Sequence, residues 1–486
     1  MVEERSLARA GMRGSLVTVS AQAISMFFRI FGLIVLARLL TPSLFGLAAI
    51  AVAISTFASS IIFLGLPMAT AQAEKLSNRA QSSLFLVNLV LGILVCSLMF
   101  FSASAISRYY EHPLLEDLIQ WLAIVPLLSG IQSQFRLTLV RSLRFTVLGV
   151  SDVVGQGIST IVSIFLALSG YSVAAIITQN VVMVLVQSII VIFAARWAPG
   201  MPGAWSTEVL PILRVGINIF GINILRDGSR SALIPIMATQ SGPSALGAYD
   251  RAQQLSIVPI SLTVDQLQRV VVPVLTRLRN DRKKLGEHYR RAQLMVCYTS
   301  GASFAFLAAV SPVLVEIFLG SDWAEAGLIL QILSVGAVFR AIAHATQWLF
   351  ISSGATAASL KLSAVAQPSI LLMSLAGLPW GVFGVAIANS IAWAIYWPIS
   401  SVVAARVSGF ASRPLVRDCI RCFFLFCLPV GVAASLAGQL SDLPFVSFGL
   451  SVVSAIASVV LLFLIAQPLR RDFMNLKSAM LMARDR

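Results

Sequence analysis

Long apolar stretches recur along the whole chain and restrict its fold more than any other feature. A stretch of about twenty apolar residues is long enough to cross a bilayer as an α-helix. Because lipid offers no hydrogen-bond partners, the backbone of such a segment has to pair internally. The sequence predicts an all-α polytopic membrane protein with about fourteen transmembrane helices. The first covers roughly residues 16–39, and the others centre near Ala53, Leu91, Pro126, Ser159, Val184, Asn223, Pro259, Phe304, Phe339, Leu371, Ile391, Leu425 and Ser454.

The composition supports this class. Of the 486 residues, 58% are hydrophobic and only 11% are charged, whereas soluble domains carry about 25% charged residues. The first apolar stretch follows Arg5, Arg9 and Arg13, which is also the pattern of a signal peptide. That stretch is too long for a signal peptide, contains Arg29, and is not followed by a small-residue cleavage site. We therefore expect a retained helix.

Basic residues concentrate in alternate loops. The net charge is +15, but the cations are spread over short loops, which argues against a nucleic-acid-binding face. The positive-inside rule then places both termini in the cytoplasm. The run Arg277–Arg291 is interpreted as a cytoplasmic topology anchor, with binding to anionic lipid or a partner as the alternative. The basic groups are Lys75 and Arg79; Arg136, Arg141 and Arg144; Arg196 and Arg214; Arg277–Arg291; Lys361; Arg406–Arg421; and Arg470–Arg486.

The chain contains an internal repeat. Pro42-Ser43-Leu44-Phe45-Gly46 matches Pro243-Ser244-Ala245-Leu246-Gly247, and each motif lies thirteen residues after an arginine, Arg29 or Arg230. Near the end of each half, Tyr171 and Asn180 match Trp380 and Asn389. Six crossings separate the matches, so we expect two parallel halves with a site between them. The predicted divisions are an N-terminal lobe at 1–205, a C-terminal lobe at 206–410, and two further helices with a cytoplasmic tail at 411–486.

Charged and amide side chains interrupt the apolar segments. A charge in hydrocarbon costs roughly 2.5 to 3.5 kcal/mol on insertion scales, and it normally faces a bundle interior or a wet pathway. The arginines outnumber the acids, so a cavity built from them is net positive. A structural alternative stays open, because Asp250 adjoins Arg251 and Asp227 lies near Arg230. The embedded groups are Arg29, Arg226, Arg230, Arg251 and Arg340; Asp152, Asp250 and Asp265; and Asn180, Asn223 and Asn389.

Four stretches together resemble one family. Leu-Ala-Arg-Leu-Leu-Thr-Pro-Ser-Leu-Phe-Gly-Leu at Leu36–Leu47 is similar to the N-terminal signature of Wzx-type polysaccharide flippases. These flippases belong to the multidrug/oligosaccharidyl-lipid/polysaccharide exporter superfamily. Three further stretches resemble the same lipopolysaccharide and exopolysaccharide branch in the same order. They are Ala245–Leu255, Val272–Asp281 and Ser321–Leu333.

The resemblance implies two six-helix lobes around a central cavity, plus two C-terminal helices. It implies alternating-access flipping of undecaprenyl-pyrophosphate-linked oligosaccharide units from the cytoplasmic to the periplasmic leaflet of the bacterial inner membrane. The product would be exopolysaccharide, O-antigen or capsule. The expected partners are the lipid-linked oligosaccharide and membrane lipids, with polysaccharide polymerase and co-polymerase proteins as further candidates. We expect no cofactor, no metal and no nucleic acid.

The embedded residues suit such a substrate. Arginine stays charged and its planar guanidinium donates two parallel hydrogen bonds to phosphate. The five embedded arginines are therefore candidate pyrophosphate ligands. The asparagines are candidates for sugar hydroxyls, although each could equally bond a neighbouring helix. Asp152, Asp250 and Asp265 are candidates for ion coupling.

Other functions remain open. A drug/cation antiporter of the same superfamily would favour acids and aromatics in its cavity. A membrane glycosyltransferase or polymerase would show a large loop with clustered catalytic residues. Catalytic motifs such as Walker A are not found in the sequence. The spacing Cys419-x-x-Cys422 is half of a metal-binding pattern, but the sequence shows no second half, so we interpret these cysteines as membrane-helix residues.

Overall fold

The computed structural model describes residues 2–63, 76–203 and 205–472, and every regular element in these ranges is a helix. Side chains are described from residue 20 onward, with further exceptions inside 206–230 and at 356. The predicted all-α membrane fold is confirmed. Tertiary contacts divide the chain into two compact units, Met1–Gly247 and Ala248–Arg486.

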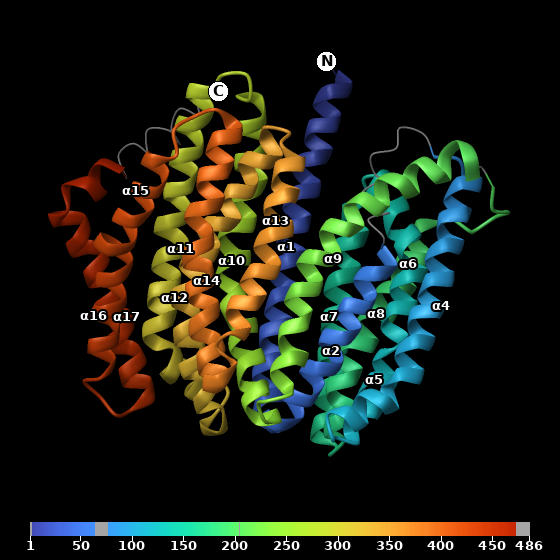
Figure 1. The fold of residues 1–486 in the computed structure, drawn as a ribbon, viewed down its shortest axis with the longest axis horizontal. Coiled ribbons are helices and arrows are strands. Elements are labelled where there is room, and N and C mark those ends of the chain that lie inside the picture. The colour runs from blue at the N-terminus through green and yellow to red at the C-terminus, as the bar shows by residue number, and fades with distance from the viewer. Residues whose placement is uncertain (1, 64–75, 204, 473–486) are drawn as a thin grey trace. The chain divides into compact units, whose positions relative to one another are not determined.

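The first unit contains the helices up to the start of α10 (Figure 1). Its most extensive helix pairs are α7 with α8, α1 with α7, α4 with α6, α6 with α8, and α2 with α9. The bounds are α1 Val2–Leu39, α2 Pro42–Phe63, α4 Asn78–Tyr109, α5 Leu114–Leu122, α6 Ile124–Arg141, α7 Phe145–Leu168, α8 Ser172–Ala195, the π-helical turn η1 Trp205–Val209, and α9 Leu210–Ala238.

The second unit is built mainly on α12, which packs on α11 and on α14. The two helices after them, α16 and α17, form a hairpin, and α16 also packs on α11. The bounds are α10 Pro243–Arg277, α11 Arg282–Phe318, η2 Ser321–Trp323, α12 Ala324–Ser352, α13 Thr356–Leu375, η3 Leu378–Trp380, α14 Gly381–Ser408, α15 Arg413–Cys422, η4 Phe423–Cys427, α16 Leu428–Gly438, and α17 Pro444–Ile465.

Each unit presents rows of large apolar side chains outward at helical spacing. On α14, Ile387, Ile391, Ile395 and Ile399 are all exposed, and they recur every four residues. Residues four apart lie on one face of a helix. Such a continuous apolar face would be unstable in water. It is therefore the face expected to meet lipid.

Small residues let the helices approach closely on the inner faces. A Cβ added at Gly336 of α12 would lie 2.6 Å from the Cα of Ser390 in α14. The Ser390 hydroxyl donates to the Ile332 carbonyl across the same interface, at 3.0 Å. Close backbone approach through small residues, with hydroxyls bridging the helices, is typical of packing in membranes.

The number of crossings stays a prediction. Twelve candidate spans are found in the described residues, and one of them, Ala357–Ser408, contains both α13 and α14. The 29-residue helix α9 is not among the twelve, and many of its side chains lie outside the described residues. The lobe boundaries at 205 and 410 also stay predictions.

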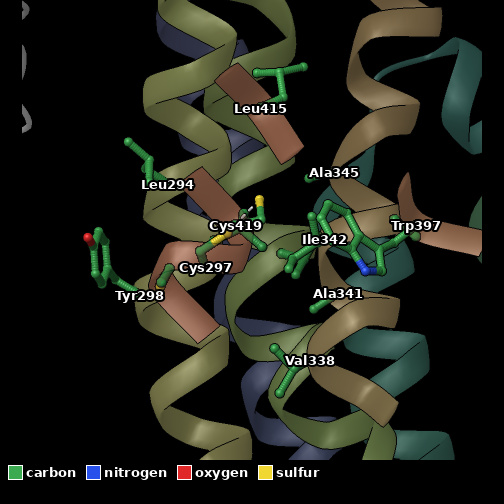
Figure 2. Packing of buried hydrophobic residues seen from close by; sticks show 14 of the residues in the cluster. Leu294, Cys297, Tyr298, Val338, Ala341, Ile342, Ala345, Trp397, Leu415 and Cys419 are labelled. Carbon is green, nitrogen blue, oxygen red and sulfur yellow. Dashed lines mark hydrogen bonds between the residues drawn. The ribbon is translucent and has the colours of Figure 1, made fainter. Parts of the chain in front are cut away.

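The core of the second unit joins α11, α12, α14 and α15 (Figure 2). In it, the Cys297 sulfur of α11 lies 3.2 Å from the Cys419 sulfur of α15. Cys422 and Cys427 are buried in the same cluster. Packing places Cys297 beside the Cys419-x-x-Cys422 pair from 122 residues away along the chain. These cysteines are free thiols, and the described residues contain no group arranged to hold a metal.

An ionic network ties the chain after α17 back to α11 and α15. The Asp418 carboxylate of α15 is almost fully buried and accepts a hydrogen bond from Arg290 of α11. Arg421 bonds Asp472, which also accepts a hydrogen bond of 2.7 Å from the Tyr298 hydroxyl. This network therefore ties the segment around Asp472 to α11 and α15.

Candidate functional site

The first turns of α10 carry a small polar cluster inside the second unit. The Asp250 carboxylate accepts a hydrogen bond of 2.7 Å from Arg251 and one of 2.9 Å from Gln254, both at Oδ2. Both members of the ion pair are largely buried, with 12% of each side chain exposed. The sequence prediction left pairing of Asp250 with Arg251 open, and the structure confirms that they pair.

A second arginine of this unit sits among aromatic rings. The Arg340 guanidinium of α12 lies 5.3 Å from the centroid of the Trp393 ring of α14. Its charge also acts on the fully buried Tyr249 of α10, which precedes the Asp250–Arg251 pair. Cation–π contacts are worth about 0.5 to 2 kcal/mol, more when water is excluded. The structure thus places the Arg340 guanidinium of α12 against the Trp393 ring of α14.

Sequence reasoning missed both aromatic residues. Tyr249 and Trp393 look like ordinary apolar-segment residues, because aromatic side chains are common in membrane helices. A signal was present for Tyr249, which lies in the stretch Ala245–Leu255 that carries the family resemblance. No comparable signal marks Trp393.

The predicted asparagines make helix contacts. Asn389 of α14 donates to the Ser374 hydroxyl of α13 at 2.9 Å, which is the helix-bridging role left open from the sequence. Asn180 of α8 donates to the Ile176 carbonyl of its own helix at 3.5 Å. Neither contact uses all the hydrogen-bonding capacity of an amide, which has two donors and two acceptor lone pairs. Contact with sugar hydroxyls stays a prediction for both.

Arg29 lies on an exposed face of α1 in the first unit, seven residues after the exposed Gln22. Residues seven apart lie on one helix face. Near them, α7 packs on α1, where the Thr160 hydroxyl donates to the Phe28 carbonyl at 3.5 Å. An exposed guanidinium within a membrane span is stable only where water or a counter-charge reaches it. That Arg29 lines a wet pathway stays a prediction.

Asp152 of α7 forms an ion pair with Arg136 of α6. Arg136 was predicted in a cytoplasmic loop, but it lies inside α6 and bonds Asp152 of α7 at 3.1 and 3.2 Å. The two residues stand eight positions on either side of Arg144, at the turn of the α6–α7 hairpin. In an antiparallel hairpin such positions face each other. The loop placement of Arg136 was wrong because α6 continues to Arg141.

Asp265 differs from the other two carboxylates. It lies on α10 with an exposed side chain, and the nearest charge acting on it is Arg269, one turn further along the helix. Residues four apart on a helix interact weakly, by about 0.2 to 0.5 kcal/mol. Of the three ion-coupling candidates, Asp265 is therefore the one least committed to a structural bond.

Three predicted residues cannot be described at the side-chain level. The α9 backbone carries them, but the side chains of Arg226, Arg230 and Asn223 lie outside the described residues. The structure brings together Asp250 with Arg251, and Arg340 with Trp393, within the second unit. For the other sequence-predicted site residues, a shared site stays a prediction.

A protein-family model matches most of the chain. Residues 35–328 match the family model described as polysaccharide biosynthesis protein. The chain is 23% identical to the teichuronic acid biosynthesis protein TuaB of Bacillus subtilis (strain 168), over 62% of each protein. It is also 23% identical to the succinoglycan biosynthesis transport protein ExoT of Rhizobium meliloti (strain 1021), over 62% of this chain and 61% of ExoT. The matched region thus spans about three fifths of these two relatives.

A third relative is the lipopolysaccharide biosynthesis protein WzxC of Escherichia coli (strain K12). It is 23% identical over 68% of this chain and 67% of its own length.

Solved structures share the fold. The lipid II flippase MurJ in an inward closed conformation has a TM-score of 0.74 at 15% identity, covering 95% of this chain and 100% of MurJ. An inward-facing multidrug resistance transporter of the MATE family and MOP superfamily has a TM-score of 0.65 at 17% identity, covering 81% and 98%. At these identities the likeness concerns the fold alone.

Proposed function

Because this chain belongs to the polysaccharide biosynthesis protein family, we propose that it is a flippase for lipid-linked oligosaccharides. It moves undecaprenyl-pyrophosphate-linked repeat units from the cytoplasmic to the periplasmic leaflet of a bacterial inner membrane. The units then enter a surface polysaccharide such as exopolysaccharide, O-antigen or capsule. The names of TuaB, ExoT and WzxC support a polysaccharide substrate. The shared fold of the lipid II flippase supports a lipid-linked one.

The observation that carries the proposal is Arg340, a guanidinium in the apolar helix α12 that lies against the Trp393 ring of α14. Its guanidinium lies 5.3 Å from the centroid of the Trp393 ring. A guanidinium stays charged and donates hydrogen bonds as a planar fork, which is the geometry that binds phosphate oxygens in pairs. Arg29 adds positive charge at an exposed position of α1 in the first unit, whereas Arg251 is paired with Asp250.

Ion coupling is part of the proposal, and Asp265 is its main candidate residue. Asp152 already bonds Arg136, and one oxygen of Asp250 bonds both Arg251 and Gln254. Asp265 is exposed on α10, where the charge acting on it is that of Arg269, one turn further along the helix.

A drug/cation antiporter is the second candidate, because the multidrug transporter shares the fold. Such a protein has to attract cations. The described embedded arginines repel them, so this function ranks below the flippase.

The experiment that tests the proposal is genetic. The gene is deleted in the host, and the surface polysaccharides and the lipid-linked intermediates are analysed. The flippase predicts loss of one polymer and accumulation of its complete lipid-linked unit on the cytoplasmic side. Accumulation of an incomplete unit would instead indicate a glycosyltransferase. Unchanged polymers with increased drug sensitivity would indicate the antiporter.

A further inference from the structure

The first unit contains a cavity between α5 and the first turns of α8. Its volume is about 660 Å³, and it lies beside the three-residue turn that joins α7 to α8. Ligand pockets in proteins commonly measure about 300 to 1,000 Å³. None of the residues lining it belongs to the arginine and carboxylate set described above.

Two exposed aromatic side chains line this cavity. Trp121 of α5 is 66% exposed and Tyr171 of the turn is 64% exposed. The backbone fixes Tyr171 firmly. Gly170 has φ +86°, its N–H bonds the Ala167 carbonyl at 3.1 Å, and the Tyr171 N–H bonds the Leu166 carbonyl at 2.9 Å. This is the Schellman arrangement that ends a helix, and it fixes the backbone of Tyr171 at the edge of the cavity.

Polar groups accompany the aromatic rings. Asp117 lines the cavity and lies four residues before Trp121, so the two share one face of α5. The hydroxyls of Ser172 and Thr178 on α8 line the same cavity. A carboxylate accepts hydrogen bonds, and hydroxyls both donate and accept. The remaining wall is apolar and includes Ile177 and Val181 of α8.

We propose that this cavity binds a sugar residue of the oligosaccharide head group, an inference that rests on the proposed function. A pyranose ring has an apolar C–H face, which packs on Trp121 or Tyr171, and hydroxyls at its rim, which donate to Asp117. Trp and Tyr supply a large, rigid contact area at low entropy cost. The site thus serves as a sugar-binding station separate from the embedded arginines.

The position of the cavity gives the station its place in transport. It lies at the Leu168–Tyr171 end of α7, and Arg141 and Arg144 lie at the opposite end of that helix. With those arginines on the cytoplasmic side, as the loop charges predict, the cavity opens at the periplasmic boundary. The sugar head group would then bind here as it leaves.

A phospholipid is the competing occupant, because Trp and Tyr also gather at membrane boundaries. Such an interfacial role does not account for Asp117, whose negative charge repels a lipid phosphate. The carboxylate favours a neutral, hydroxyl-rich head group instead. We therefore assign the cavity to a sugar, and the experiment below includes a phospholipid as the competing occupant.

The test uses the full-length protein in nanodiscs. The probe is tritium-labelled free oligosaccharide, released by mild acid from the lipid-linked units that accumulate in the deletion strain. Equilibrium dialysis should show saturable binding to the wild-type protein. Trp121→Ala and Tyr171→Ala should each weaken binding by up to roughly tenfold, as expected for loss of one aromatic contact. Trp121→Phe should retain most of it, and Asp117→Asn should weaken it because an amide is a poorer acceptor.

Trp380→Ala is the matched control. Trp380 occupies the position equivalent to Tyr171 in the second repeat and is 74% exposed, but it lies outside this cavity. Its loss should leave binding unchanged.

The outcomes separate the two proposals. If the wild-type protein restores export yet shows no saturable sugar binding, the station is rejected and the flippase stands. The sugar-binding station would also be rejected if Trp121→Ala and Trp380→Ala weakened oligosaccharide binding equally. Photolabelling of Trp121 by a phospholipid probe that the oligosaccharide does not compete away would reject it as well. If no lipid-linked unit accumulates in the deletion strain, the proposed function fails and the station falls with it.

Discussion

Gly46 and Gly247 meet where α2 and α10 begin, and each occupies the space that a side chain on the other would need. A Cβ at Gly46 would lie 1.8 Å from the Pro243 carbonyl oxygen, and a Cβ at Gly247 would lie 2.0 Å from the Pro42 oxygen. The contact is therefore reciprocal. These residues are the ends of the two repeated Pro-Ser motifs, 201 positions apart in the sequence. A two-fold relation between the motifs produces this reciprocity.

The first prediction concerns this contact. Gly46→Ala and Gly247→Ala should each destabilise the protein, because the new methyl group meets backbone that cannot rotate away. Overpacking typically costs about 1 to 3 kcal/mol, and a backbone obstacle should reach the upper end. The measurement is the thermal unfolding of purified variants in detergent. Gly242→Ala is the control, since no atom lies within 4 Å of its Cβ. If all three variants unfold at the same temperature, the first turns of α2 and α10 can move apart at little cost, and the prediction is wrong.

The second prediction treats Arg136 and Asp152 as a structural pair. Asp152→Arg and Arg136→Asp should each reduce the folded protein in the membrane, and the double swap should restore much of it. The side chains are 33% and 42% exposed, so a coupling of about 1 kcal/mol is expected. A double-mutant cycle in thermal unfolding measures it. If Asp152→Asn instead abolishes export while the protein stays stable, and the swap does not rescue export, Asp152 couples an ion.

The third prediction concerns Arg340. Arg340→Ala should reduce polymer export in the deletion strain while the protein still inserts. Losing one buried, hydrogen-bonded charge contact commonly costs about 2 to 5 kcal/mol, which is roughly 30-fold or more in affinity. Arg340→Lys keeps the charge but loses the planar fork, so it should retain partial export. Membrane levels are checked by blotting. Full export by Arg340→Ala would assign this residue to packing against Trp393.

The fourth prediction is topological. Asn280 lies between α10 and α11, and Gln240 lies between α9 and α10. Single cysteines at these positions, in a chain freed of its native cysteines, should react with impermeant maleimide from opposite sides of intact cells. Asn280→Cys should react only after permeabilisation, because the adjoining basic run is expected in the cytoplasm. Labelling of both from outside would overturn the orientation.

Periodicity and charge predicted the fold class because both are local properties of the sequence. Long apolar segments restrict a chain to membrane helices wherever they occur. The Asp250–Arg251 pair could also be anticipated, since the two residues are adjacent. The partner of Asp152 could have been found from the hairpin symmetry about Arg144.

Other contacts could not be predicted, because they depend on tertiary packing. Cys297 meets Cys419 across 122 residues, and the ring of Trp393 meets Arg340 from a different helix. In the sequence, nothing distinguishes Cys297 or Trp393 from the apolar residues around it. Such pairs become visible only once the helices are packed.

The central claim is that embedded arginines carry a pyrophosphate-linked sugar across the membrane. Reconstituted protein tests it most directly, with a fluorescent lipid-linked oligosaccharide in both leaflets and a membrane-impermeant quencher outside. Wild-type protein should expose the inner pool within the assay, and the Arg29→Ala, Arg230→Ala double variant should slow this by roughly 30-fold or more. The account would be contradicted if the inner-leaflet pool became accessible to the quencher no faster than in protein-free liposomes. It would also be contradicted if the double variant exposed this pool as fast as the wild-type protein.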